Sequence, residues 1–288
     1  MPFPSPPFPV CRRTHRFTIR PPSRIVQEAA RKVLPFRKEG IGYRMSGKRG
    51  KKFQSTLQSR LLHEMREGAF RGAKYLPSEN DLAKRMDVSR TQLRDALARL
   101  EREGFISRRH GVGTMINRHV LALAVRMDLE VEFLEMVERS GYRPDVVLLS
   151  TERLPAGAGA AERLGMEAEE PVLRNVRLVT ADGRPAIYCE DYIPFRMVRA
   201  PLPDPKEMEL PIFHFLEDHC GAEPCMDLTE IRAVPADGRI AEALGLAPGT
   251  PLLYMDEVDY DVAGRPILYA RQFYADGIIR QTLMRKKI

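Results

Sequence analysis

Apolar residues recur at helical spacing in three short segments in the first half of the chain. The first segment covers residues 57–65 and ends at Gly68. The second begins at Ser78, a typical N-cap residue that is followed by acidic residues in the first turn. The third begins at Ser89, which has a glutamine three residues later as in a capping box, and it ends at Gly104. These patterns predict three helices joined by short turns.

Two short β-prone runs follow the third helix. Residues 105–109 and 114–117 flank the glycine-rich residues 110–113, which is the pattern of a β-hairpin. The order of helix, helix, turn, helix and hairpin predicts a winged helix-turn-helix over residues 53–117. We expect a linker and a helix over residues 118–139.

The second half of the chain contains an internal repeat. Pro155-Ala156 recurs as Pro235-Ala236, and Gly183-Arg184-Pro185 recurs as Gly264-Arg265-Pro266. Each copy has the pattern of a short helix, a strand, a tight turn and a second strand. Two such copies predict one antiparallel sheet with helices packed on it, in a domain over residues 140–288, and the whole chain is therefore of the α+β class.

The charge of the chain is unevenly distributed along its 288 residues. Residues 1–52 contain 14 Lys and Arg against 2 Asp and Glu, whereas residues 118–288 contain 20 against 29. A basic front of this kind favours a polyanionic partner. Prolines interrupt residues 1–52, which predicts a disordered, basic, Pro-rich tail. This tail is either a DNA-contacting arm or a stretch upstream of a natural start at Met45.

The third predicted helix has the features of a DNA-recognition helix. Arg90, Thr91 and Arg94 face outward near its N-terminal end, where residues that read the major groove lie. Arginine is the commonest specific reader because it donates two hydrogen bonds to guanine. In the hairpin, glycines allow the backbone to approach phosphate or the minor groove. The candidate DNA-contacting residues are Ser78, Glu79, Ser89, Arg90, Thr91, Gln92, Arg94, Arg108, Arg109, His110, Gly111, Gly113 and Thr114.

Three runs in this region resemble the DNA-binding domain of the GntR family. They are Leu76-Pro77-Ser78-Glu79, Val88-Ser89-Arg90-Thr91 and His110-Gly111-Val112-Gly113-Thr114. The resemblance implies that Arg90, Thr91 and Arg94 contact bases or phosphates, and that His110-Gly111 enters the minor groove. The family often has arginine where this chain has Asn80, which implies a different contact at that position.

Residues 140–288 are similar to the effector-binding UTRA domain of the HutC subfamily of GntR regulators. The similarity is carried by Leu154-Pro155-Ala156, Asp182-Gly183-Arg184-Pro185 and Tyr192-Ile193-Pro194, among other short motifs. It implies a chorismate-lyase-like antiparallel-sheet domain. It also implies a sequence-specific transcription regulator of the repressor type, whose operator binding a small molecule modulates.

The effector pocket is expected between the sheet and the loops of the repeat. Arg177 would hold a carboxylate or phosphate of an anionic effector, or else form a surface ion pair. Family members that bind phosphosugars carry Arg-x-Arg where this chain has Arg177-Leu178-Val179, and their carboxylate positions fall here at Cys189 and Leu268, which disfavours a phosphosugar. The candidate effector-contacting residues are Arg177, Cys189, Glu190, Tyr192, Tyr269 and Tyr274.

The other expectations concern partners and competing functions. The spacing of His214, His219, Cys220 and Cys225 does not match a structural zinc site, so neither a metal nor a cofactor is expected. No apolar run approaches the roughly 20 residues that a membrane span needs. One winged helix covers a half-site, so we expect a cytoplasmic homodimer on a two-fold-related operator in double-stranded DNA, with a hinge near residues 118–128. A lyase-like enzyme and a non-specific nucleic-acid-binding protein are the alternatives.

Overall fold

The computed structural model describes residues 57–109, 111–200 and 211–285. The predicted tail over residues 1–52 and the candidate DNA contact at His110 lie outside the described residues. No helix in the described part of the chain is long and apolar enough to cross a membrane.

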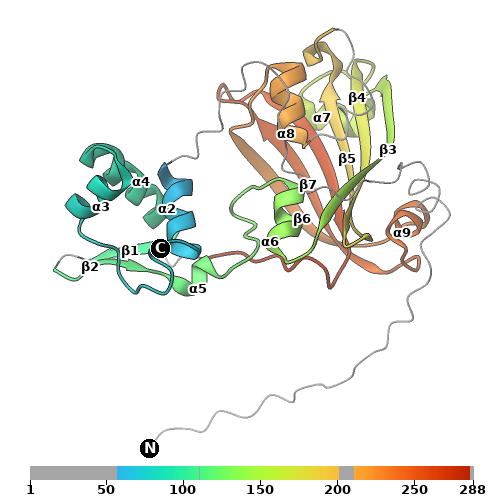
Figure 1. Cartoon of the computed structure of the whole chain (residues 1–288). Coiled ribbons are helices and arrows are strands. Elements are labelled where there is room, and N and C mark those ends of the chain that lie inside the picture. The colour runs from blue at the N-terminus through green and yellow to red at the C-terminus, as the bar shows by residue number, and fades with distance from the viewer. Residues whose placement is uncertain (1–56, 110, 201–210, 286–288) are drawn as a thin grey trace, which may run out of the picture.

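The first domain is the predicted winged helix-turn-helix (Figure 1). Its elements are α2 (Leu57–Arg66), α3 (Glu79–Met86), α4 (Arg90–Arg102), β1 (Ile106–Arg109) and β2 (Gly113–Ile116). The caps expected from the sequence set where two of these helices begin. Ser78 accepts a hydrogen bond from the backbone N–H of Asp81, and Ser89 forms a capping box with Gln92. Buried leucines from all three helices form the core, with Leu61, Leu82, Leu93 and Leu97 almost fully enclosed.

Two short helices connect the domains. They are α5 (Arg118–Leu121) and α6 (Phe133–Arg139). Arg118 fixes the start of this connection, because its guanidinium donates to the backbone carbonyls of Met65, Phe70 and Ala73. The predicted helix of this region is confirmed only over residues 133–139.

The second domain is built on one antiparallel sheet of six strands in the order β3-β4-β5-β8-β7-β6. The strands are β3 (Pro144–Pro155), β4 (Pro171–Ala181), β5 (Arg184–Pro194), β6 (Met226–Pro235), β7 (Pro251–Tyr260) and β8 (Pro266–Tyr274). The repeat is confirmed, since α7 (Gly157–Leu164) precedes the β4–β5 hairpin and α9 (Gly238–Leu244) precedes the β7–β8 hairpin. The repeat pattern did not predict β3 and β6, the two edge strands.

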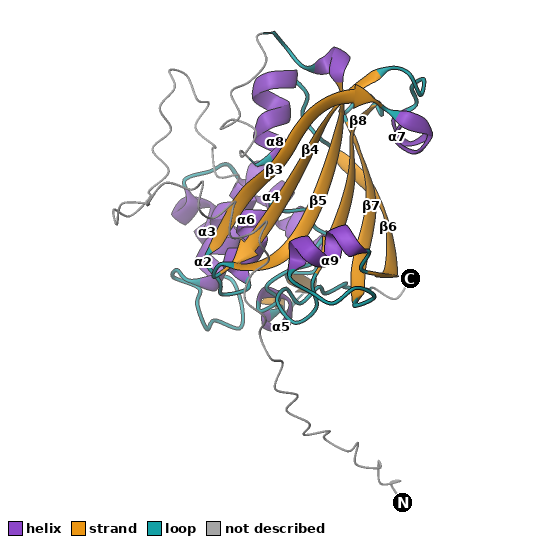
Figure 2. Ribbon diagram, turned by 90° about the vertical axis from the view of Figure 1, so that its right-hand side faces the viewer, coloured by secondary structure: helices purple, strands orange, loops and turns teal. Residues whose placement is uncertain are grey.

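The two faces of the sheet have different coverings (Figure 2). On one face, α9 packs on Tyr188 and Phe273, and α7 packs on Val258. On the other face, α6 packs on Val179, and α8 (Ile212–Phe215) packs on Leu268. Two short turns of helix complete the layers, η1 (Phe195–Met197) and η3 (Leu216–Cys220).

The end of the chain returns to the first domain. Figure 1 shows the last described segment, in red, running from the sheet toward the winged helix. The backbone N–H of Met127 donates to the carbonyl of Thr282 at 2.8 Å, so the C-terminal segment runs beside the linker. Met284 packs against the core of the DNA-binding domain. The two domains are therefore connected by two segments of the chain, the linker and the C-terminal segment.

Candidate functional site

The outward face of α4 presents the expected DNA readers. Arg90, Thr91 and Arg94 are exposed, while Leu93 and Leu97 of the same helix are buried. Arg94 donates to a carboxylate oxygen of Glu79 at 2.8 Å, so Glu79 holds this guanidinium between α3 and α4. In the free protein, Glu79 therefore contacts an arginine of the recognition helix.

Three other candidates on these helices have structural roles in the free protein. The hydroxyl of Ser78 contacts the Asp81 carboxylate at 2.6 Å as well as capping α3. Gln92 accepts from the backbone N–H of Ser89 at 3.0 Å, while the Ser89 hydroxyl accepts from the backbone N–H of Gln92. These side chains set the start and the angle of the helices that carry the arginines.

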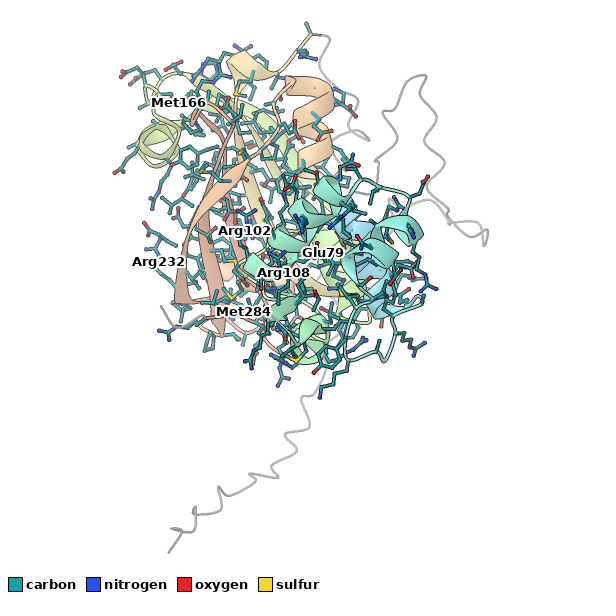
Figure 3. The ribbon with its side chains drawn as sticks, turned by 90° about the vertical axis from the view of Figure 1, so that its left-hand side faces the viewer. Glu79, Arg102, Arg108, Met166, Arg232 and Met284 are labelled. Atoms are coloured by element: carbon teal, nitrogen blue, oxygen red, sulfur yellow. The ribbon has the colours of Figure 1, made fainter. Side chains whose placement is uncertain are left out.

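The two arginines of the wing also differ in role, since one forms an ion pair within the domain and the other is exposed. Arg108 forms an ion pair with Glu101 of α4 at 2.7 Å, which fixes the wing against the recognition helix. Arg109 is exposed at the end of β1, and Gly111 and Gly113 have positive φ angles of 75° and 101°. Thr114 is half-buried, and its carbonyl accepts from the backbone N–H of Leu76. Figure 3 shows Arg108 and Glu79 on the DNA-binding domain.

The expected effector residues lie on both faces of the sheet, because neighbouring side chains along a strand alternate. Arg177, Cys189 and Tyr274 lie on the face covered by α6 and α8. Arg177 is buried and ion-paired, with its Nε 2.9 Å from Oδ2 of Asp191. The Cys189 thiol contacts the other oxygen of Asp191 at 3.1 Å, and burial raises the pKa of this thiol well above its usual value.

Glu190, Tyr192 and Tyr269 lie on the opposite face, with α7 and α9. Glu190 is buried and accepts hydrogen bonds from Arg174 at 2.7 Å and Arg271 at 2.9 Å. Burial opposes ionisation, but these guanidinium groups hold the pKa of Glu190 below its usual range. Tyr192 stacks on Tyr269 with ring centroids 5.4 Å apart. The structure therefore does not bring the six candidates together in one pocket.

A cavity of about 350 Å³ lies on the face that carries Arg177 and Tyr274. Its wall opposite the sheet is the linker and the start of α6, rather than the loops of the repeat. Apolar side chains form much of the lining, including Phe133, Met136, Phe213 and Met255. Of the six candidates, Tyr274 is a lining residue. The volume of the cavity is in the range of small-molecule sites.

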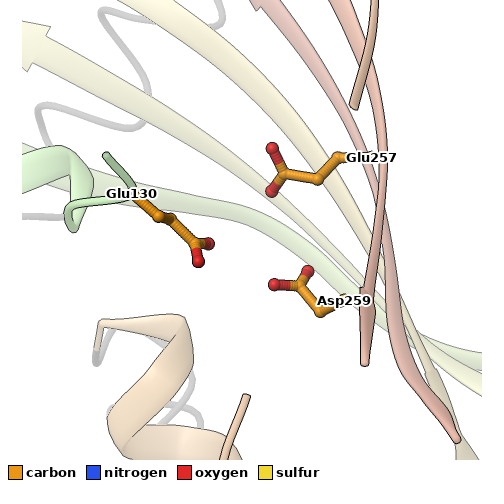
Figure 4. A group of neighbouring side chains, drawn as sticks. All are labelled: Glu130, Glu257 and Asp259. Carbon is orange, nitrogen blue, oxygen red and sulfur yellow. The ribbon is translucent and has the colours of Figure 1, made fainter. Parts of the chain in front are cut away.

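Two lining residues that the sequence analysis did not single out, Glu130 and Glu257, converge with a third acid beside the cavity, Asp259 (Figure 4). Glu130 comes from the linker, and Glu257 and Asp259 come from β7. Oxygen atoms of all three lie within 4.8 Å of one another. The available signal was the placement of Glu257 and Asp259 at alternate positions of a strand, which puts both on one face.

The environment of these carboxylates favours their protonated forms. Burial, together with repulsion from the other acids, raises the pKa of Asp259 to about 10, that of Glu130 to about 8 and that of Glu257 to about 7. Glu130 is exposed as a whole residue, but its carboxylate points toward Asp259. Glu257 accepts hydrogen bonds from Thr229 at 3.0 Å and Gln272 at 2.9 Å. Asp259 is fully buried, and apart from the carboxyl group of Glu130, with which it can share a proton, neither of its oxygens has a hydrogen-bond partner within the described residues.

The comparisons with known proteins match both domains. Residues 53–116 match the model of bacterial regulatory proteins of the gntR family, and residues 139–276 match the UTRA domain. The HTH-type transcriptional regulator Rv0792c of Mycobacterium tuberculosis is 32% identical over 67% of this chain and 70% of its own length. The chain belongs to the GntR family of bacterial transcriptional regulators.

Other relatives agree with this membership. A probable fructoselysine utilization operon transcriptional repressor of Escherichia coli O157:H7 is 23% identical over 81% of this GntR regulator and 94% of its own length. The solved structure of the possible transcriptional regulator YydK of Bacillus subtilis has a TM-score of 0.66 and 18% identity, and it covers 80% of this chain and 99% of that one. The predicted fold is thereby confirmed. The names of the relatives are those of regulators and not of enzymes.

Proposed function

We propose that this GntR regulator acts as a cytoplasmic homodimer that binds a two-fold-related operator through α4 and the wing, and that a small molecule in the cavity alters this binding. The observation that carries the proposal is the position of Arg126. This residue lines the cavity, and its guanidinium donates to the carbonyl of Glu103 at 2.7 Å, directly after α4. The same group lies 5.0 Å from the centroid of the Phe105 ring.

This contact gives a physical route between effector and DNA. A ligand changes DNA affinity only if it binds two arrangements of the protein differently. The linker that forms the cavity wall also carries Arg126 to the end of the recognition helix. A ligand that moves this wall therefore changes the support of α4, without any contact of its own to DNA.

The lining of the cavity argues against the anionic effector expected from Arg177. That guanidinium is not among the lining residues, and Asp191 already pairs with it. The acids at this end of the cavity bring no positive charge with which a carboxylate or phosphate ligand could pair.

The proposed use of α4 is tested with Arg90→Ala. This variant should lose about 1–3 kcal/mol of discrimination between the best site and other sequences, because a bidentate contact to one base is removed. The measurement is selection of binding sites from randomised double-stranded DNA, followed by titration of the selected sequence against scrambled DNA. Arg99→Ala is the control, since Arg99 is exposed at the far end of the same helix.

Two results would contradict this assignment. If Arg90→Ala weakens all sequences equally, Arg90 contacts phosphate only. If the wild-type protein selects no sequence and its binding depends on salt alone, the chain is a non-specific nucleic-acid-binding protein.

A further inference from the structure

Acidic residues far outnumber basic ones in the described lining of the cavity. Six acidic residues line it, namely Asp128, Glu130, Glu132, Asp191, Asp227 and Glu257. Arg126 is the single Lys or Arg among the described lining residues. Three of the acids have strong partners: Asp128 pairs with Arg126, Asp191 pairs with Arg177, and Glu132 accepts from the backbone N–H of Phe213 at 3.0 Å.

The acids that have no cationic partner among the described residues lie together at one end of the cavity. Among the described residues, Glu130, Glu257 and the adjacent Asp259 have no ion-pair partner. Asp259 is the decisive member, since it is completely enclosed and, within the described part of the chain, its oxygens have no hydrogen-bond partner other than the acid Glu130. Buried carboxylates are normally paired or hydrogen-bonded. An orphaned carboxylate that points at two others indicates a missing cationic partner.

We propose that the effector is an organic cation, whose ammonium or guanidinium group is held by Glu130, Glu257 and Asp259 and whose apolar part lies along Phe133, Met136 and Met255. This inference rests on the proposed function, because it names the class of molecule that the same cavity binds.

The geometry suits an ammonium group. Such a group has three N–H donors, and the cluster offers one carboxylate for each. A nitrogen about 2.8 Å from each of three oxygens allows those oxygens to lie up to about 4.8 Å apart. The three carboxylates lie within 4.8 Å of one another.

The remainder of the cavity favours a carbon-bearing ligand over a bare metal ion. A volume of about 350 Å³ is far larger than one ion needs. The walls away from the carboxylates are mainly apolar, and Phe133 meets Tyr274 edge-on with ring centroids 6.5 Å apart. Apolar walls with a few placed polar groups are typical of small-molecule sites.

The test uses the full-length protein and simple probes. These are n-butylammonium as the cation, butyrate as the anion and 1-butanol as the neutral molecule, each at matched ionic strength. The readout is the midpoint of thermal unfolding, which rises when a ligand binds the folded state. We expect n-butylammonium to raise the midpoint in a dose-dependent and saturable way, and butyrate and butanol to have no such effect.

Variants locate the site of binding. Asp259→Asn and Glu257→Gln should each raise the apparent dissociation constant of n-butylammonium at least about tenfold, measured against the unliganded midpoint of each variant. Glu242→Gln is the matched control, since Glu242 is an exposed acid of α9 on the opposite face of the sheet. It should bind n-butylammonium as the wild type does.

Each contrary outcome overturns the proposal in a recognisable way. A larger effect of butyrate would make the effector anionic, and a response to Mg²⁺, Ca²⁺ or Zn²⁺ without a response to n-butylammonium would make the cluster a metal site. Equal binding by the wild type and Asp259→Asn would show that the cation does not bind at this cluster. No response to n-butylammonium at millimolar concentration would likewise contradict a cationic effector. Operator binding is measured on the same preparations, so that a regulator with a different effector is distinguished from a protein that does not bind specific DNA.

Discussion

At the scale of single residues, Asp259 makes the stability of the protein depend on pH. Its folded pKa of about 10 lies above the value of about 3.9 expected in the unfolded chain. The folded state therefore retains a proton that the unfolded state releases, so the contribution of Asp259 to stability is largest below about pH 4 and is lost as the pH rises through about 10. Asp259→Asn removes this titration. We expect the unfolding free energy of the variant, relative to that of the wild type, to rise with pH and to be at least about 1–3 kcal/mol higher at pH 9 than at pH 5.

Denaturant titrations near these two pH values measure the gain. The control is Asp276→Asn, because Asp276 is an exposed aspartate outside the cavity. This control should differ from the wild type by less than about 0.5 kcal/mol at either pH. Parallel pH profiles for Asp259→Asn and the wild type would show that Asp259 does not carry the effect.

At the scale of elements, the edge strand β6 is the surface we expect to form the dimer. It pairs with β7 on one side, and the described part of the chain gives it no partner on the other. Met226 and Leu228 are 59% and 63% exposed on this strand. Unpaired edges with exposed apolar residues favour pairing with another strand. Leu228→Lys should raise the dimer dissociation constant at least about tenfold.

Sedimentation equilibrium of the full-length protein measures this change. Val262→Lys is the control, since Val262 is a 91% exposed apolar residue in the turn between β7 and β8 and not on the edge strand. If the two variants dimerise equally well, β6 is not the interface.

At the scale of the whole molecule, Arg126 and the C-terminal segment join the two domains. Arg126 is buried among Phe105, the Glu103 carbonyl and Asp128, and the C-terminal segment adds the contact of Met284. Replacing a buried, fully bonded arginine leaves polar groups without partners. We expect Arg126→Ala to lower the unfolding free energy by about 2–4 kcal/mol and to split one thermal transition into two.

Differential scanning calorimetry distinguishes one transition from two. Arg280→Ala, at an exposed arginine in the same C-terminal segment, should keep the wild-type profile. A single cooperative transition in Arg126→Ala would show that other contacts couple the domains.

The sequence by itself determined the features that depend on neighbouring residues. Helical spacing, N-caps and glycine-rich turns are local signals, so α2, α3, α4 and the wing followed directly from them. The repeat likewise predicted the two hairpins of the sheet and the helix before each. The repeated motifs begin only at the last residues of β3 and β6, Pro155 and Pro235, so these two strands were not predicted.

Tertiary structure alone decided what the effector cavity contains. Cys189 and Glu190 are adjacent in sequence but lie on opposite faces of the sheet, and the candidate residues were divided accordingly. Asp191 forms an ion pair with the guanidinium of Arg177. Glu130 lies close to Glu257 and Asp259, although more than a hundred residues separate them in the sequence. Burial and strand register create these partnerships, and both are set by the packing of distant segments. The sign of charge that the cavity accepts is therefore a property of the fold and not of any one motif.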